Sequence, residues 1–124
     1  MFTVFLRVVG SVQVALGAAY LFAPGLFLML MGHSTAAPDL YYPLGMLAAR
    51  FVAYGIAFWI ISKQADRHAL WVGLMGLIQA IDLLVGVVYT ARGVVPLTLS
   101  AFPMFNAVWI GAICAVWYLR QQRQ

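Results

Sequence analysis

Two charged side chains stand inside long apolar stretches, where an unpaired charge is costly. Arg50 lies in the stretch that begins near residue 42, and Asp82 lies in the one that begins near residue 69. At 1.5 Å per residue, both lie roughly 12 Å below the outer ends of their stretches. A lone charge at the centre of a bilayer costs about 2.5–3.5 kcal/mol on insertion scales. We therefore predict that Arg50 and Asp82 form an ion pair between sequential antiparallel helices.

Such a pair has two interpretations. It could lock the packing of two neighbouring helices, which is the interpretation we favour. It could instead anchor a ligand head group or take part in a proton relay. Both interpretations stay open from the sequence.

Further polar side chains reach similar depths and could line one pocket in the outer half of the bundle. They are Gln13, Tyr54, Gln79 and Asn106. In the simpler interpretation each amide bonds across helices, which is worth about 0.6 kcal/mol apiece. In the other, a small polar pocket with aromatic walls could take a quinone or a lipid head group.

Metal, haem and nucleophilic chemistry find little support in the sequence. His33 and His68 fall in expected loops, so we expect no imidazole inside the spans to ligate haem. Cys114 is the only cysteine and Glu is absent, so neither a zinc nor a di-iron pattern is present. We expect no metal or haem ligation and no catalytic residue in this chain, which favours a non-enzymatic role and leaves enzymatic activity open.

The composition indicates the elements that must carry these residues. Of the 124 residues, 65% are hydrophobic and 8% are charged, against about 25% charged residues in an average globular chain. Seven basic side chains are too few and too scattered for a nucleic-acid surface. We predict an all-α integral membrane protein, a four-helix transmembrane bundle in one domain over residues 1–124. The expected spans are about 4–22, 42–62, 69–91 and 101–119.

Helix boundaries follow from prolines and short polar residues. Pro24 breaks the first span, and Leu26–Met31 is too short to cross a membrane, so it lies at the interface or folds back on the bundle. Asp39 is the expected N-cap of the second span, with Pro43 in its first turn. Asp66 is the expected N-cap of the third span.

The basic residues predict the orientation. Only Arg92 falls on the outer side if both termini lie inside. This asymmetry satisfies the positive-inside rule, so we predict N-in and C-in. The basic residues of the inner segments are Arg7, Lys63, Arg67, Arg120 and Arg123.

A ladder of small residues runs along the second span. Its members are four residues apart, so they share one stripe of the helix: Gly45, Ala49, Ala53 and Ala57. We define these four residues as the small-residue ladder. Small side chains let two helix backbones approach closely in a membrane, so the ladder predicts a helix-packing surface.

Three segments together resemble the DoxX-like superfamily of small four-helix membrane proteins, which has many bacterial members. The segments are Gly17-Ala-Ala-Tyr-Leu-Phe-Ala-Pro24, the apolar run that ends at Gly32, and Arg50-Phe-Val-Ala-Tyr-Gly55. The resemblance implies a location in the bacterial cytoplasmic membrane. Founding members of that superfamily are associated with a quinol oxidase and a thiosulfate:quinone oxidoreductase, which implies a quinone nearby.

Two functions are compatible with these features. We favour a non-catalytic accessory or structural subunit of a larger membrane complex, with membrane lipids and other subunits or further copies of the chain as partners. The alternative is a small quinone- or lipid-binding membrane protein of redox type that uses the polar residues around Arg50 and Asp82. A transporter is disfavoured, because Asp82 is the only carboxylate within the expected spans.

Overall fold

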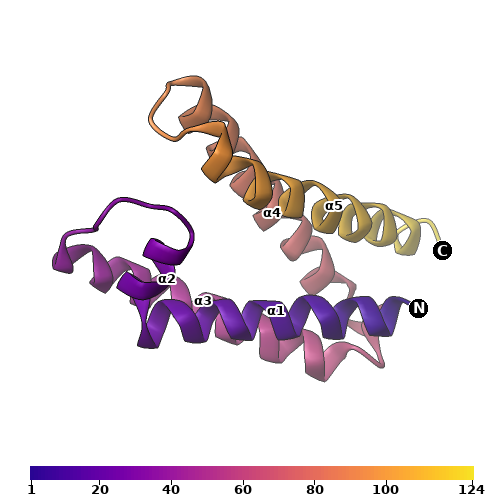
Figure 1. Cartoon of the computed structure of the whole chain (residues 1–124). Coiled ribbons are helices and arrows are strands. Elements are labelled where there is room, and N and C mark those ends of the chain that lie inside the picture. Colours follow the sequence, from indigo (N-terminus) through magenta and orange to yellow (C-terminus); the bar gives the residue numbers. More distant parts are fainter. The chain divides into compact units, whose positions relative to one another are not determined.

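The protein is an all-α chain with four long helices. The computed structural model describes all residues from 1 to 124. Each long helix is long and apolar enough to cross a membrane, so the prediction of an all-α integral membrane protein with four spans is confirmed. The long helices are α1 (Phe2–Phe22), α3 (Tyr41–Ile61), α4 (Ala69–Ala91) and α5 (Leu97–Gln121), and a short helix α2 (Pro24–Leu30) follows α1 (Figure 1).

The helices are grouped in two compact units, each built on an antiparallel helical hairpin. The first unit, Met1–Lys63, pairs α1 with α3 and carries α2. The second unit, Gln64–Gln124, pairs α4 with α5. The prediction that all four spans form a single domain stays a prediction, and each unit is described by itself below.

Small residues spaced seven apart bring α1 and α3 into backbone contact. A hypothetical Cβ atom added to a glycine shows how close its neighbours lie. On Gly10 it would be 2.8 Å from the carbonyl oxygen of Gly55, and on Gly17 it would be 2.9 Å from the carbonyl oxygen of Ala48. Seven residues make nearly two helical turns, so Gly10 and Gly17 fall on one side of α1, as Ala48 and Gly55 do on α3. Residue 10 therefore lies beside residue 55, and residue 17 beside residue 48.

The small-residue ladder occupies a different face of α3. Nothing lies within 4 Å of a Cβ placed on Gly45, and both Ala49 and Ala53 are exposed. The two small residues of α3 that approach the backbone of α1 are Ala48 and Gly55, which are buried. The ladder is thus not the surface that builds the hairpin.

Helix α2 is seated on the end of this hairpin. Ala23 leaves the helical conformation (φ −143°, ψ 54°) because the residue before a proline disfavours it, and Pro24 then starts α2. The ring of Phe27 packs edge-on against Tyr20 of α1, with 4.9 Å between centroids. The segment therefore folds back onto the hairpin, although none of its side chains is buried.

Glycines of α4 receive larger side chains of α5. A Cβ atom placed on Gly73 or Gly86 would lie 3.0 or 2.6 Å from the partner side chain, so that side chain would have to shift, whereas one on Gly76 would make an ordinary contact at 3.5 Å. The pairs are Gly73 with Tyr118, Gly76 with Cys114, and Gly86 with Met104.

Two helices end in the same hydrogen-bonded cap. Gly32 after α2 (φ 86°) and Gly93 after α4 (φ 70°) adopt the left-handed conformation that glycine tolerates best. Beyond α4, the amide of Val94 donates to the carbonyl of Tyr89, and that of Gly93 donates to Thr90. The same two-bond pattern follows α2, so each cap pairs helix-end carbonyls that would otherwise be unpaired.

Three predicted boundaries are wrong. Asp39 does not cap α3, because it lies within a 3₁₀ turn, Pro38–Leu40, that leads into the helix. Asp66 does not cap α4, because it lies in the 3₁₀ turn Ala65–His68 and accepts a hydrogen bond from Gln121 Nε2 instead (3.0 Å).

The third boundary concerns α5, which begins four residues earlier than predicted. Pro96 holds an extended backbone at the N-cap, and the amides of Leu99 and Ser100 donate to its carbonyl (3.0 and 3.3 Å). The hydroxyl of Thr90 in α4 donates to Ser100 Oγ at 2.7 Å, which fastens this first turn to the neighbouring helix. The helix therefore runs through Pro103 instead of starting beside it.

Candidate functional site

The first unit contains three of the predicted polar residues, in different surroundings. Gln13 is buried, with 6% of its surface exposed. Tyr54 is half-buried and packs edge-on against Phe58, with 6.2 Å between ring centroids. Arg50 is exposed. The structure therefore places an amide within the α1/α3 seam and a charge outside it.

The backbone contacts of this hairpin fix the relative depths. Because residue 10 lies beside 55 and 17 beside 48, Gln13 is level with position 52, midway between Arg50 and Tyr54. At 100° per residue, Arg50 lies about 140° around α3 from Gly55, so it faces away from α1. The same rotation places it about 60° from Ala53, at the edge of the small-residue ladder.

The second unit contains the other three residues. Gln79 is buried. If Gly111 of α5 carried a Cβ atom, it would lie 3.1 Å from the Cβ atom of Gln79. Its amide nitrogen donates to the sulfur of Met75 at 3.4 Å, a weak bond within α4. Asn106 is half-buried and accepts a hydrogen bond from the indole nitrogen of Trp109 (2.9 Å), whereas Asp82 is exposed.

Arg50 lies as far from the start of α3 as Asp82 lies from the end of α4. Arg50 is nine residues after Tyr41, where α3 begins, and Asp82 is nine residues before Ala91, where α4 ends. Nine residues correspond to roughly 14 Å along a helix. Their ion pair, and one pocket formed by all six polar residues, stay predictions.

A polar cluster at the other end of the α1/α3 hairpin was not predicted. Arg7 Nε donates to Ser62 Oγ (3.2 Å), and the guanidinium carbon lies 5.2 Å from the centroid of the Trp59 ring. The Trp59 indole nitrogen donates to Ser11 Oγ at 3.1 Å. We call these four residues the Arg7 cluster.

The signal for this cluster was present in the glycine spacing. Pairing Gly10 with Gly55 sets the antiparallel register, and that register brings the turn around Arg7 beside residues 58–62. From the sequence, Arg7 served only as an orientation signal, and the register between the two helices was not predicted.

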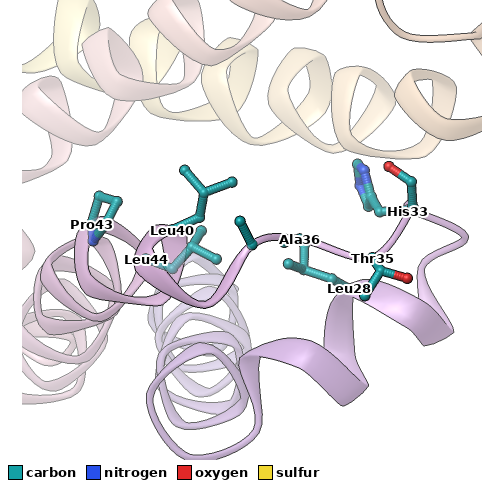
Figure 2. A pocket seen from close by; sticks show the side chains of 9 residues that line it. Leu28, His33, Thr35, Ala36, Leu40, Pro43 and Leu44 are labelled. Atoms are coloured by element: carbon teal, nitrogen blue, oxygen red, sulfur yellow. The ribbon is translucent and has the colours of Figure 1, made fainter.

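The first unit also carries an open cavity of about 420 Å³ near the N-terminal end of α3 (Figure 2). Its lining combines leucines with the imidazole of His33 and the hydroxyls of Ser34 and Thr35. Its residues come from α2, the loop after it and the start of α3: Leu28, His33, Ser34, Thr35, Ala36, Ala37, Leu40, Pro43 and Leu44.

A shallower groove of about 270 Å³ follows the α4/α5 seam. Gln79 is its one polar side chain, and the rest of the lining is small or aliphatic. Its other residues are Gly76, Ala80, Leu83, Ala107, Val108, Gly111, Ala112 and Ala115. Asp82 and Asn106 do not line it.

Comparisons with family models, with curated proteins and with solved structures find no match to this chain. The resemblance to the DoxX-like superfamily accordingly stays a prediction, carried by residues 17–24, Gly32 and residues 50–55. The chemistry and geometry of the two hairpins are therefore the basis for inferring a function.

Proposed function

We propose that the protein is a non-catalytic accessory or structural subunit of a larger complex in the bacterial cytoplasmic membrane, with both termini inside. One observation carries the proposal: α1 leaves uncovered the face of α3 that bears Arg50 and the small-residue ladder. Arg50, Ala49 and Ala53 are all exposed there, in the middle of an apolar helix.

Contact with lipid is unfavourable for the face of α3 that bears Arg50 and the small-residue ladder. An arginine that faces acyl chains near mid-membrane costs several kcal/mol unless it reaches water or an acceptor. Small residues, in contrast, give little contact area to lipid and allow a second helix backbone to come close. A protein helix with an acceptor for the guanidinium satisfies both requirements.

The exposed surface of the chain supports the same conclusion. Within its unit, each long helix packs along one face against the other helix of its hairpin, so its remaining faces can meet lipid or protein. The connections between the long helices are short, and the longest of them contains α2. The chain thus offers its surface for assembly within the membrane.

Purification in a mild detergent tests the proposal. We expect a stoichiometric complex with at least one other membrane protein, and we expect Ala53→Leu to dissociate it by closing the small-residue ladder. Ala15→Leu is the matched control, because Ala15 is exposed on α1 at the depth of Arg50. Native mass spectrometry of both variants gives the answer. A chain that runs alone, or a complex that survives Ala53→Leu, would contradict the proposal.

A second candidate function is that of a small quinone- or lipid-binding protein of redox type. The cavity in the first unit favours it, because apolar side chains and hydrogen-bonding groups share its lining. Leu44 of that lining precedes Arg50 on α3 by six residues, roughly 9 Å along the helix. A head group in the cavity would then have its tail free to follow the span.

This candidate predicts binding of a short-chain ubiquinone analogue, measured by quenching of tryptophan fluorescence. We expect Ala36→Trp, which fills the cavity, to weaken binding if the cavity is the site. We expect Arg50→Gln to weaken it if the predicted polar residues are the site. Binding that neither variant changes, or no saturable binding at all, would refute the candidate.

A further inference from the structure

We propose that the Arg7 cluster binds the phosphate of an anionic phospholipid at the membrane boundary. The site belongs to the first unit alone and is distinct from the face of α3 that carries the proposed function. Three features of Arg7 support the site: its geometry, its lack of a carboxylate partner and its position on the hairpin.

Hydrogen bonds hold the guanidinium of Arg7 in one orientation. Ser62 Oγ donates to the carbonyl oxygen of Trp59 (2.9 Å) and accepts the bond from Arg7 Nε (3.2 Å). The indole below the guanidinium is itself fixed by its bond to Ser11. The planar group therefore lies against the ring of Trp59, where the cation–π attraction adds to the hydrogen bond.

The guanidinium of Arg7 still has unused hydrogen-bond donors. Arginine carries five N–H donors, and the hydrogen bond to Ser62 uses only the one on Nε, so the two terminal nitrogens keep theirs. The only acidic residue of Met1–Lys63 is Asp39, which precedes α3 and so lies at the opposite end of the hairpin from Ser62. Within this unit the positive charge of Arg7 has no carboxylate to pair with.

The position on the hairpin matches the depth of lipid phosphates. Arg7 lies in the second turn of α1, about 7.5 Å from its start. Ser62 directly follows the end of α3, and the exposed Lys63 comes next. Tryptophan is enriched at this depth, where its ring is apolar and its nitrogen meets polar groups. On the predicted orientation, this end faces the inner leaflet.

A lipid phosphate fits the site better than a free one. Arginine recognises phosphate oxygens with two parallel charge-assisted bonds from its terminal nitrogens. On the side of Arg7 that faces the middle of the helices, Val8 and Val12 are 51% and 47% exposed, an apolar stripe along which acyl chains can pack. Inorganic phosphate has no group that would use that surface.

The experiment titrates the full-length protein in mild detergent with dioleoylphosphatidylglycerol and follows its thermal unfolding. A ligand that binds only the native state raises the midpoint, and at a given concentration a tighter ligand raises it more. We expect phosphatidylglycerol to raise the midpoint, and both dioleoylphosphatidylcholine and inorganic phosphate to leave it unchanged. Arg7→Lys keeps the charge and loses both Nε and the planar fork. We expect it to weaken phosphatidylglycerol binding about tenfold.

Two further variants separate geometry from charge. Ser62→Ala should weaken binding in the same direction as Arg7→Lys, because it releases the guanidinium while keeping every charge. Arg123→Gln is the control: it removes one positive charge from the exposed C-terminal tail and should leave binding unchanged. The proposal would be overturned if Arg7→Lys bound phosphatidylglycerol as tightly as the wild type, or if Arg123→Gln lost as much binding as Arg7→Lys. It would also be overturned if inorganic phosphate raised the midpoint as much as phosphatidylglycerol.

Discussion

Replacement of Gly55 by alanine should destabilise the α1/α3 hairpin by about 1–3 kcal/mol, the usual cost of overpacking a tight site. The added Cβ would lie 2.6 Å from the carbonyl oxygen of Gly10 and 2.9 Å from the amide nitrogen of Val14. Both are backbone atoms of α1, so neither can turn aside as a flexible side chain would. The two helices must therefore move apart along their seam.

The same substitution at Gly45 is the matched control. Gly45 lies on α3 with nothing within 4 Å of its placed Cβ, so alanine there meets no obstacle. In a helix interior alanine is favoured over glycine by about 1 kcal/mol, so Gly45→Ala should be neutral or stabilising. Reversible unfolding in mixed micelles measures both variants. Equal changes at the two positions would show that the contact between Gly10 and Gly55 does not hold the hairpin.

Long apolar helices were predictable because their signal is strong and local. The third span was expected over residues 69–91, which are the bounds of α4, and the second was expected within one residue of α3. A run of about 20 apolar residues has few alternative structures, since every backbone polar group must be bonded inside the membrane. The break at Pro24 is equally local, and α2 begins there.

Caps and helix faces were harder to predict, because they depend on neighbours that are distant in sequence. Asp66 has the residue type and position of an N-cap, yet its carboxylate bonds to Gln121, 55 residues away. The small-residue ladder looked like the main packing surface, whereas the seam with α1 uses Ala48 and Gly55. Composition shows which residues permit close packing, but only the register between two helices shows which ones are used.

The positions of the polar residues along their helices were predictable, but their surroundings were not. Arg50 lies nine residues from the start of α3 and Asp82 lies nine residues from the end of α4, while their matched depth in one bundle stays a prediction. Nothing in those positions indicated that Gln13 would be buried in a seam while Arg50 is exposed, or that Trp109 would donate to Asn106. Those differences depend on rotation about each helix, which a one-residue change in register alters by about 100°.

Removal of one charge from the predicted Arg50–Asp82 pair should be far more damaging than removal of both. Asp82→Asn leaves Arg50 without its counter-charge inside the membrane, and loss of one member of a buried pair typically costs about 3–5 kcal/mol. The double variant, Arg50→Leu with Asp82→Leu, removes both charges, so no unpaired charge remains inside the membrane. We expect it to unfold near the wild-type midpoint in mixed micelles.

Together with the single variants Arg50→Leu and Asp82→Leu, the double variant forms a double-mutant cycle, whose coupling energy isolates the interaction from the effect of each single change. The assembly of the double variant then shows what the pair is for. If the pair only locks helices, the double variant keeps both its stability and its place in the purified complex. If the charges serve a partner or a ligand, the double variant is stable but loses that assembly or binding, because leucine offers neither a donor nor an acceptor. Unchanged stability and unchanged assembly in Asp82→Asn would refute both interpretations, because a carboxylate that pairs with Arg50 or with a ligand cannot be replaced by a neutral amide without loss.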